Sequence, residues 1–366
     1  MSNKSIYFSG LNGLRAISAI AVVVSHTTLS LKEFNLDPFL FGVSQEGKPQ
    51  GLSLAGYGVS IFFVLSGFLI TFLLQTEKDI QDINIKNFYT RRILRIWPLY
   101  YLYIGLYIVT MLIYGICIDW QTLLYYILPA ANIPFITGGS TVGLLSHYWS
   151  LGVEEQFYLF WPWLNKKATM LLSLAITLII ILISAKTVLH LFYPNSIWEV
   201  SIHITRFHCM LIGAAGALLY KNKNTLFLAL VNNKLTQSVC WVIIFLVAIN
   251  KYHIASFIDN EIISVVALCL IIGQIEIKNR MVNLEVGLLD FLGRISFGIY
   301  VLHPLLIFFI SKLLPDMTIY LPLRYIIVYL LILTTTIFFS YLSYRYFEKY
   351  FLNFKTRFEI VKGYKN

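Results

Sequence analysis

Charged residues are scarce in this sequence, at 13% of 366 positions. A soluble globular chain carries roughly 25% charged residues, because charged side chains face the surrounding water. A chain with half that fraction of charged residues does not have enough of them to cover the surface of a water-soluble protein of this size. Disorder is excluded as well, because 58% of the residues are hydrophobic and disordered chains are poor in apolar residues. The remaining class is an all-α polytopic membrane protein.

Cysteine and metal-ligand patterns are also scarce. Each of the four cysteines lies alone in an apolar stretch, without a Cys-x-x-Cys pair or a Cys/His ligand spacing: Cys117, Cys209, Cys240 and Cys269. We therefore interpret them as small apolar residues rather than as a disulfide framework, and we expect no metal site.

Long hydrophobic runs are abundant. A spanning helix needs roughly 20 mostly apolar residues, and about ten segments meet that rule. The predicted transmembrane helices are 11–31, 52–75, 98–118, 147–164, 168–192, 203–220, 235–251, 257–276, 287–311 and 320–344. The segment 121–136 is apolar but short and contains Pro129 and Pro134, so we predict that it is re-entrant or interfacial.

The basic charge of the sequence, formally +10, predicts an orientation. With the N-terminus inside, the inner segments carry twenty Lys and Arg residues. The outer loops carry only Lys32, Lys48, Lys251 and Lys312. Because basic residues collect in cytoplasmic loops, we predict that both termini are cytoplasmic. The same bias accounts for most of the net charge, so we expect no nucleic-acid partner.

Arg15 and His26 are ionisable residues within the first predicted span. Their separation is close to three helical turns, so both project from one helix face with a rise of roughly 16 Å between them. A histidine near mid-membrane can act as a base or nucleophile, and an arginine at the cytoplasmic edge can hold an anion. The alternative is a snorkelling arginine and a histidine that hydrogen-bonds between helices.

Three arginines, Arg91, Arg92 and Arg95, lie in a predicted inner loop just before Pro98. On a helix, Arg91 and Arg95 would share one side, with Arg92 three residues before Arg95. Three guanidinium groups together suit the phosphates of a ligand. A basic patch that contacts anionic lipid headgroups explains the same spacing, so both interpretations stay open.

The fourth predicted span begins with two adjacent carboxylates, Glu154 and Glu155. Glu154 shares a helix face with Tyr158. A patch at the membrane interface explains the nearby Trp and Tyr residues but not Glu154. Structural and functional interpretations are equally open for the later polar residues Arg206, Tyr300, His303 and Glu348.

Six short motifs occur in an order that resembles the integral-membrane acyltransferase 3 family. This family includes bacterial O-antigen and peptidoglycan O-acetyltransferases and Nod-factor acetylases. The motifs are LNGLRAI (11–17) followed by His26, GVSIFFVLSGFLI (58–70), RRILRIWP (91–98), WSLGVEEQFY (149–158), RFHCMLIGA (206–214) and GRISFGIYVLHP (293–304). The resemblance covers residues 7–350, which we predict to be the transmembrane domain, followed by a basic cytoplasmic tail at 351–366.

The sequence departs from the family pattern at two positions. Gly152 stands where the family usually has Ser, Ala or Thr, and Tyr350 replaces the usual Pro, which leaves the end of the last span open. Some members carry an additional SGNH-type esterase domain. This sequence resembles the stand-alone form.

The resemblance implies transfer of an acyl group, usually acetyl, from cytoplasmic acetyl-CoA to a hydroxyl of a lipid-linked or envelope glycan such as the O-antigen of lipopolysaccharide, in a bacterial inner membrane. On this basis we assign His26 and Glu154 to catalysis. We assign Arg15, Arg91, Arg92 and Arg95 to acetyl-CoA binding. Acceptor binding is assigned to Trp149, Gln156, Tyr158, Arg206, Tyr300, His303 and Glu348.

Two other functions stay open. The first is a transporter or flippase for a glycan or acyl intermediate, with His26, Arg15 and Glu154 as a proton relay. Acceptor flux without an acylated product would favour it. The second is a non-catalytic membrane scaffold, against which the costly intramembrane charges argue. The sequence specifies neither the oligomeric state nor the acceptor hydroxyl.

Overall fold

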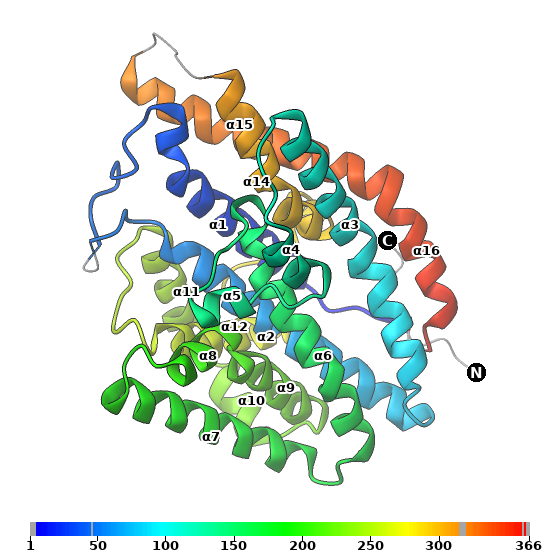
Figure 1. Ribbon diagram of the computed structural model, residues 1–366. Helices are drawn as coiled ribbons and strands as arrows, with labels where there is room; N and C mark the ends of the chain where they lie inside the picture. The colour runs from blue at the N-terminus through cyan, green and yellow to red at the C-terminus, as the bar shows by residue number, and fades with distance from the viewer. Residues whose placement is uncertain (1–4, 45–46, 315–319, 361, 364–366) are drawn as a thin grey trace.

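The computed structural model describes residues 5–44, 47–314, 320–360 and 362–363, and almost all of its regular structure is helical (Figure 1). The α-helices are α1 (Leu11–Leu29), α2 (Ser53–Ile80), α3 (Ile85–Ile113), α4 (Trp120–Ile127), α5 (Ile133–Thr137), α6 (Trp149–Lys167), α7 (Leu171–Phe192), α8 (Ile197–Thr205), α9 (Phe207–Lys221), α10 (Thr225–Val231), α11 (Lys234–Ala248), α12 (Asp259–Ile275), α13 (Gly287–Arg294), α14 (Ser296–Leu313), α15 (Leu321–Ser343) and α16 (Lys349–Lys355). Short 3₁₀ segments are η1 (Leu31–Phe34), η2 (Gly143–Tyr148), η3 (Ile277–Asn279) and η5 (Thr356–Phe358), and η4 (Tyr344–Glu348) is a π-helix.

Six helical segments within the described residues are long and apolar enough to cross a membrane, or seven if the bent pair α10–α11 forms one span. The six are Ser53–Ile80, Ile85–Ile113, Leu171–Phe192, Ile197–Lys221, Ser296–Leu313 and Leu321–Phe358. The chain is therefore a multi-pass membrane protein, but the expected number of about ten spans is not confirmed. Among the other predicted spans, α12 has only 17 residues, and α1 and α6 contain charged side chains.

The arginine segment is helical rather than a loop, because α3 runs without interruption from Ile85 through Pro98 to Ile113. Asn84 begins this helix by accepting a hydrogen bond from the amide of Asn87. The expected start of a new span at Pro98 is therefore wrong. Proline within a helix is tolerated in membrane proteins because neighbouring groups satisfy the freed carbonyl.

The predicted re-entrant segment 121–136 contains two short helices, α4 and α5, and neither is long enough to span a bilayer. Asp119 caps α4 by accepting from the amides of Gln121 and Thr122. The position of this segment relative to a bilayer stays a prediction.

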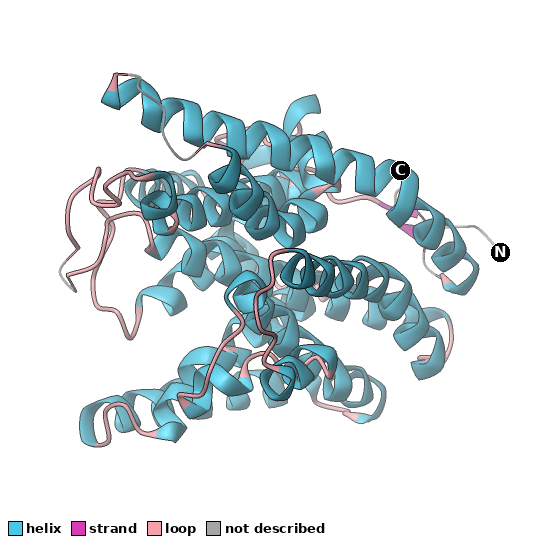
Figure 2. Ribbon diagram, turned by 45° about the horizontal axis from the view of Figure 1, so that its top comes forward, coloured by secondary structure: helices cyan, strands magenta, loops and turns pink. Residues whose placement is uncertain are grey.

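The two ends of the described chain meet. β1 (Ser5–Ile6) pairs in parallel with β2 (Lys362–Gly363), so both ends lie on the same side of the molecule (Figure 1). The long loop between η1 and α2 lies on the opposite side (Figure 2). That the shared side of the termini is cytoplasmic stays a prediction.

Helices α2 and α9 pack so closely at the centre of the fold that two glycines face backbone. A Cβ added to Gly67 would collide with the carbonyl of Met210, and one added to Gly213 would collide with the carbonyl of Val64. Small residues allow such close backbone approach in membrane proteins. This packing fixes the middle of α2, which forms part of the candidate active site described below.

We predict that Gly213→Ala lowers stability, because overpacking costs about 1–3 kcal/mol and the group it meets here is backbone that cannot rotate away. Thermal unfolding of the purified protein in detergent measures the effect as a lower melting temperature. Gly105→Ala is the matched control, since a Cβ at this α3 position has nothing within 4 Å. Equal melting temperatures for both variants would contradict the packing argument.

A buried charged cluster joins α7, α9 and α12. The Glu261 carboxylate of α12 lies 2.5 Å from Lys186 Nζ of α7 and 2.9 Å from His208 Nε2 of α9. Removing one member of a buried ion pair leaves an uncompensated charge, which costs about 3–5 kcal/mol. The cluster therefore fixes α7 and α12 to α9.

Candidate active site

A cavity of about 210 Å³ lies between α1, α2, α3, α6 and α14. Three arginines from two helices, Arg15, Arg92 and Arg95, line it together with Glu154, and we call it the arginine cavity. Its remaining walls are apolar or carry hydroxyl groups: Val59, Phe62, Phe63, Leu65, Ser66, Leu69, Leu73, Ile96, Ser150, Leu151, Tyr158, Ser296, Phe297 and Tyr300.

Two of the three arginines in the cavity, Arg15 and Arg92, are held in place by a neighbour. Arg15 donates to Asn12 Oδ1 at 3.0 Å, and Asn12 in turn donates to Asp290 at 2.8 Å. The Arg92 guanidinium lies 4.8 Å from the centre of the Tyr158 ring, a cation–π distance. The cavity therefore presents oriented guanidinium groups rather than mobile surface charges.

Glu154 is the carboxylate nearest to these arginines on the cavity wall. It interacts electrostatically with both Arg92 and Arg95. The Tyr158 hydroxyl, one helical turn further along α6, hydrogen-bonds the Ser66 hydroxyl of α2. One carboxylate against three guanidinium groups leaves the cavity positively charged, which suits an anionic ligand.

Glu348 is close enough to Arg95 to interact with it electrostatically. It ends the π-helix η4, and its carboxylate accepts a hydrogen bond of 2.9 Å from Ser343. The helical path from α15 continues through η4 into α16, so Tyr350 extends the helix where the family pattern has a proline. π-Helical turns frequently occur at functional sites, and this one places Glu348 within electrostatic range of Arg95.

His26 forms a hydrogen bond with a second histidine that is 277 residues away in the sequence. His26 Nδ1 lies 2.7 Å from His303 Nε2, and His303 Nδ1 lies 3.1 Å from the carbonyl of Ile299. A carbonyl only accepts, so His303 Nδ1 carries a proton, and neutral His303 offers its Nε2 lone pair to His26 Nδ1–H. The second nitrogen of His26, Nε2, is therefore left with its lone pair.

The histidine pair adjoins the arginine cavity through Tyr300. The Tyr300 hydroxyl donates to the carbonyl of His147 at 2.7 Å and lies 2.5 Å from the Ser150 hydroxyl. The His147 ring packs 5.3 Å from the His303 ring. Tyr300 lines the cavity and its ring lies 6.2 Å from the His303 ring, so His303 is next to the lining and His26 is joined to it through His303. His303 is fully buried, whereas His26 is partly exposed.

The sequence profile described as an acyltransferase domain matches residues 8–345. The chain belongs to the acyltransferase 3 family. The peptidoglycan O-acetyltransferase OatA of Listeria monocytogenes is 31% identical over 43% of this chain and 24% of its own length. A provisionally named O-acetyltransferase of Staphylococcus aureus is 26% identical over 94% of this chain and 57% of its own length. No solved structure matches the chain.

The chain thus spans about a quarter to somewhat over half of the length of these relatives. The family match at residues 8–345 spans the positions of the cavity arginines and of both histidines. The family match therefore spans the site.

Several of the predicted site residues lie outside the arginine cavity. Arg91 pairs with Glu77 at 2.9 Å and donates to the carbonyl of Phe358. Gln156 exchanges two hydrogen bonds with Asn132, which ties α6 to the segment before α5. Trp149 stacks under Arg206, whose guanidinium lies 5.3 Å from its ring centre. The binding roles assigned to these residues stay predictions.

Sequence reasoning missed the hydroxyl and imidazole groups that connect the cavity to the histidines. Ser66, Ser150 and His147 all lie within or beside the family motifs, but as common residue types they gave no separate signal. Only the fold brings them next to Tyr158, Tyr300 and His303.

Proposed function

We propose that this chain is a membrane O-acetyltransferase of the bacterial inner membrane. It moves an acetyl group from cytoplasmic acetyl-CoA to a hydroxyl of a lipid-linked or envelope glycan. The observation that carries the proposal is the arginine cavity, which adjoins a histidine pair with a free imidazole lone pair in a chain of the acyltransferase 3 family. The name of the Listeria relative supports a glycan acceptor, which for that protein is peptidoglycan.

The arginine cavity takes the donor. Its 210 Å³ is less than the roughly 300–1,000 Å³ of sites that enclose drug-sized ligands, so it holds only part of acetyl-CoA. Arg15, Arg92 and Arg95 bind the phosphate charges of the coenzyme. The pantetheine arm packs against the apolar wall of Phe62, Phe63 and Leu65 and extends toward Tyr300 and the histidines. Bulk water is thereby kept from the thioester.

His26 Nε2 is the reactive group. As a general base it takes the proton of the acceptor hydroxyl while that oxygen attacks the thioester carbonyl. The carbon–sulfur bond then breaks, and the coenzyme A thiolate takes up the proton. As a nucleophile the same lone pair would first form acetyl-histidine and release coenzyme A, and the acceptor would take the acetyl group afterwards. Exchange of labelled coenzyme A into acetyl-CoA without acceptor distinguishes the second route from the first.

His303 is a positioning residue, because its Nε2 accepts a hydrogen bond from His26 Nδ1–H. This bond fixes which nitrogen of His26 is reactive. We predict that His303→Ala lowers kcat by about 10²-fold, as expected for a misplaced catalytic group, with little change in KM for acetyl-CoA. Initial-rate kinetics and the pH dependence of kcat measure both. His303→Gln retains an acceptor and should recover part of the rate. A loss seen only in KM would contradict this role.

The proposed function is tested with purified chain in sealed vesicles loaded with envelope glycan. Release of free coenzyme A thiol on addition of acetyl-CoA, together with an acetylated glycan, is the expected result. Glycan that crosses the membrane without an acetylated product would instead support the transporter. Thiol release without acetylated glycan would mean thioester hydrolysis and would contradict the proposal.

A further inference from the structure

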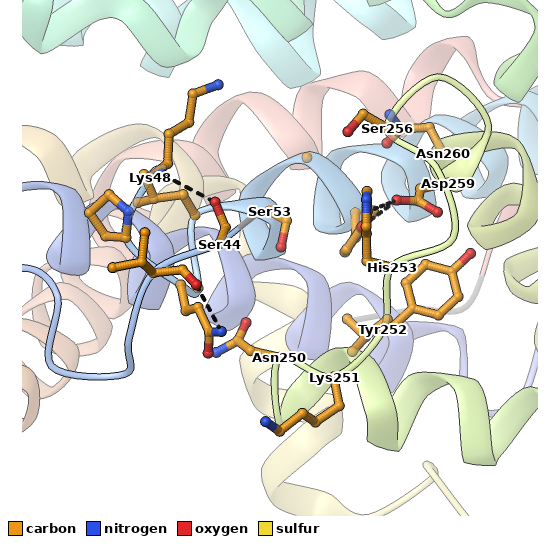
Figure 3. Close-up of a pocket in the computed structure, with 18 of the residues that line it drawn as sticks. Ser44, Lys48, Ser53, Asn250, Lys251, Tyr252, His253, Ser256, Asp259 and Asn260 are labelled. Atoms are coloured by element: carbon orange, nitrogen blue, oxygen red, sulfur yellow. Dashed lines mark hydrogen bonds and ion pairs between the residues drawn. The ribbon is translucent and has the colours of Figure 1, made fainter. Parts of the chain in front are cut away.

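A second cavity lies at the start of α2, beside its first turn. Its volume is about 570 Å³, within the range of sites that enclose small ligands. Figure 3 labels residues from three of its walls, namely the loop before α2, the loop between α11 and α12, and the first turn of α12. Arg206, at the junction of α8 and α9, closes a fourth side.

The lining of this second cavity is rich in groups that recognise hydroxyls. Side-chain amides and hydroxyls come from the two loops and from the first turns of α2 and α12: Ser44, Gln50, Ser53, Tyr57, Asn250, Tyr252, Ser256 and Asn260. Such groups donate and accept hydrogen bonds without a fixed charge. A carbohydrate, whose surface consists of hydroxyls, matches this lining better than an apolar ligand does.

Two polar atoms of the lining have no hydrogen-bond partner among the described residues, the Tyr252 hydroxyl and Asn250 Oδ1. Tyr252 is only 9% exposed. Burial, together with the nearby Asp259 charge, raises the pKa of Tyr252 to about 12, so its hydroxyl is a donor at neutral pH. Buried polar groups in folded proteins are almost always hydrogen-bonded, so an unpaired donor and acceptor on one cavity wall indicate a ligand.

The charge of the second cavity is positive. Arg206 is 7% exposed and donates to neutral oxygens of Gly56, Ser60 and Asn260, and it forms no contact ion pair within the described part of the chain. Lys48 and Lys251 are exposed and line the same cavity. A guanidinium and two ammonium groups on one cavity suit a carboxylate or phosphate.

Asp259 is the one carboxylate in the lining within the described part of the chain, and it is already engaged. Asp259 accepts from His253 Nδ1 at 2.8 Å, from the Tyr57 hydroxyl at 3.2 Å and from the amides of Ile254 and Ala255. Figure 3 shows the His253 side chain turned to Asp259. These bonds hold the loop in place and do not neutralise Arg206 or Lys251.

The second cavity abuts both parts of the candidate active site. The carbonyl of Leu52 in its wall accepts a hydrogen bond of 2.9 Å from Ser25, the residue before His26. On another side, Arg206 lies over the Trp149 ring, and Trp149 packs edge-on against Phe63, which lines the arginine cavity. A ligand in the second cavity is therefore separated from the arginine cavity by the side chains of Arg206, Trp149 and Phe63, and it lies beside the turn that carries His26.

We propose that the second cavity binds the acceptor, a carbohydrate that carries a carboxylate or phosphate group. Asn250 and Tyr252 hydrogen-bond its hydroxyls, while Arg206 and Lys251 hold its anionic group. The role as acceptor rests on the proposed acetyl transfer, but binding of such a sugar does not require the reaction.

Binding to the full chain in lipid nanodiscs tests the proposal, with three sugars that share one ring. N-acetylmuramic acid carries a carboxylate, N-acetylglucosamine 1-phosphate carries a phosphate, and N-acetylglucosamine is neutral. We expect at least one anionic sugar to bind about tenfold more tightly than the neutral one, because hydrogen bonds to charged groups are the stronger ones. The tighter of the two anionic sugars identifies the source of the charge.

Two variants of lining residues and a control locate the binding. Lys251→Ala should remove most of the preference for the anionic sugar, and Tyr252→Phe should weaken all three sugars about fivefold. Lys32→Ala removes an exposed lysine that does not line the cavity and should change nothing. Equal affinity for neutral and anionic sugars, or an equal effect of Lys32→Ala and Lys251→Ala, would overturn the proposal.

The same preparations are assayed for acetyl transfer, which separates the two proposals. If acetyl transfer proceeds but neither cavity variant changes sugar binding, the proposed acceptor site is wrong and the proposed function is unaffected. Sugar binding that responds to the variants in a chain without transfer confirms the site and contradicts the function.

Discussion

The His26→Ala variant inserts and folds normally, yet its acetyl transfer falls by about 10²–10⁴-fold, the usual contribution of general acid–base catalysis. If His26 instead carries the acetyl group, transfer is lost altogether. The reason is geometric. His26 donates its Nδ1–H to His303, so the lone pair on Nε2 is the one that His26 has free for the reaction. Steady-state rates of coenzyme A release, measured with equal amounts of purified wild type and variant, test this expectation.

A second histidine variant controls for the loss of an imidazole as such. His190→Ala removes a ring on α7 that pairs with Glu199 and lies outside both cavities. It should retain full transfer. A wild-type rate in His26→Ala, or an equal loss in both variants, would contradict the assignment of His26.

The Arg95→Ala variant should raise the KM for acetyl-CoA by roughly 10–100-fold, because a hydrogen bond to a charged group contributes about 1.5–3 kcal/mol. Arg95 faces the arginine cavity beside Arg92, and its charge is only partly offset by Glu154 and Glu348. Arg95→Lys retains the charge but not the two-pronged geometry, so its KM should lie between those of wild type and alanine. Kinetics with varied acetyl-CoA measure the series.

The competing explanation for the basic segment is contact with lipid headgroups. The Arg357→Ala variant helps to distinguish that explanation from acetyl-CoA binding. Arg357 is an exposed arginine of the C-terminal segment that does not line either cavity. Its removal should leave the KM unchanged. If Arg95→Ala changes only expression or insertion, with no effect on KM, Arg95 acts through lipid and the donor site is wrong.

The helical class of the fold follows from composition, whereas the number of spans does not. Apolar stretches identify helices, but they do not separate a helix that crosses the bilayer from one buried within the protein. α12 is such a case, since 14 of its 17 residues are buried and it is too short for the length rule. The predicted helix 98–118 shows a different error. It begins at Pro98, but Pro98 lies in the middle of α3, which begins at Ile85.

The candidate site was predictable where its residues are close in sequence. Helical spacing places Glu154 and Tyr158 on one face of α6 and Arg92 near Arg95 on α3, and all four line the arginine cavity. Arg91 shows the limit of spacing, since its guanidinium pairs with Glu77 away from the cavity. The His26–His303 contact joins helices that are distant in the chain, so no local pattern contains it.

The most direct test of the central claim compares the masses of envelope glycans from cells that express the wild-type chain, the His26→Ala variant or neither. The account predicts a glycan that is heavier by one acetyl group in the wild type alone. Identical glycan masses in all three, with the wild-type chain present in the membrane, would contradict it, as would an acetyl group that persists in the His26→Ala cells.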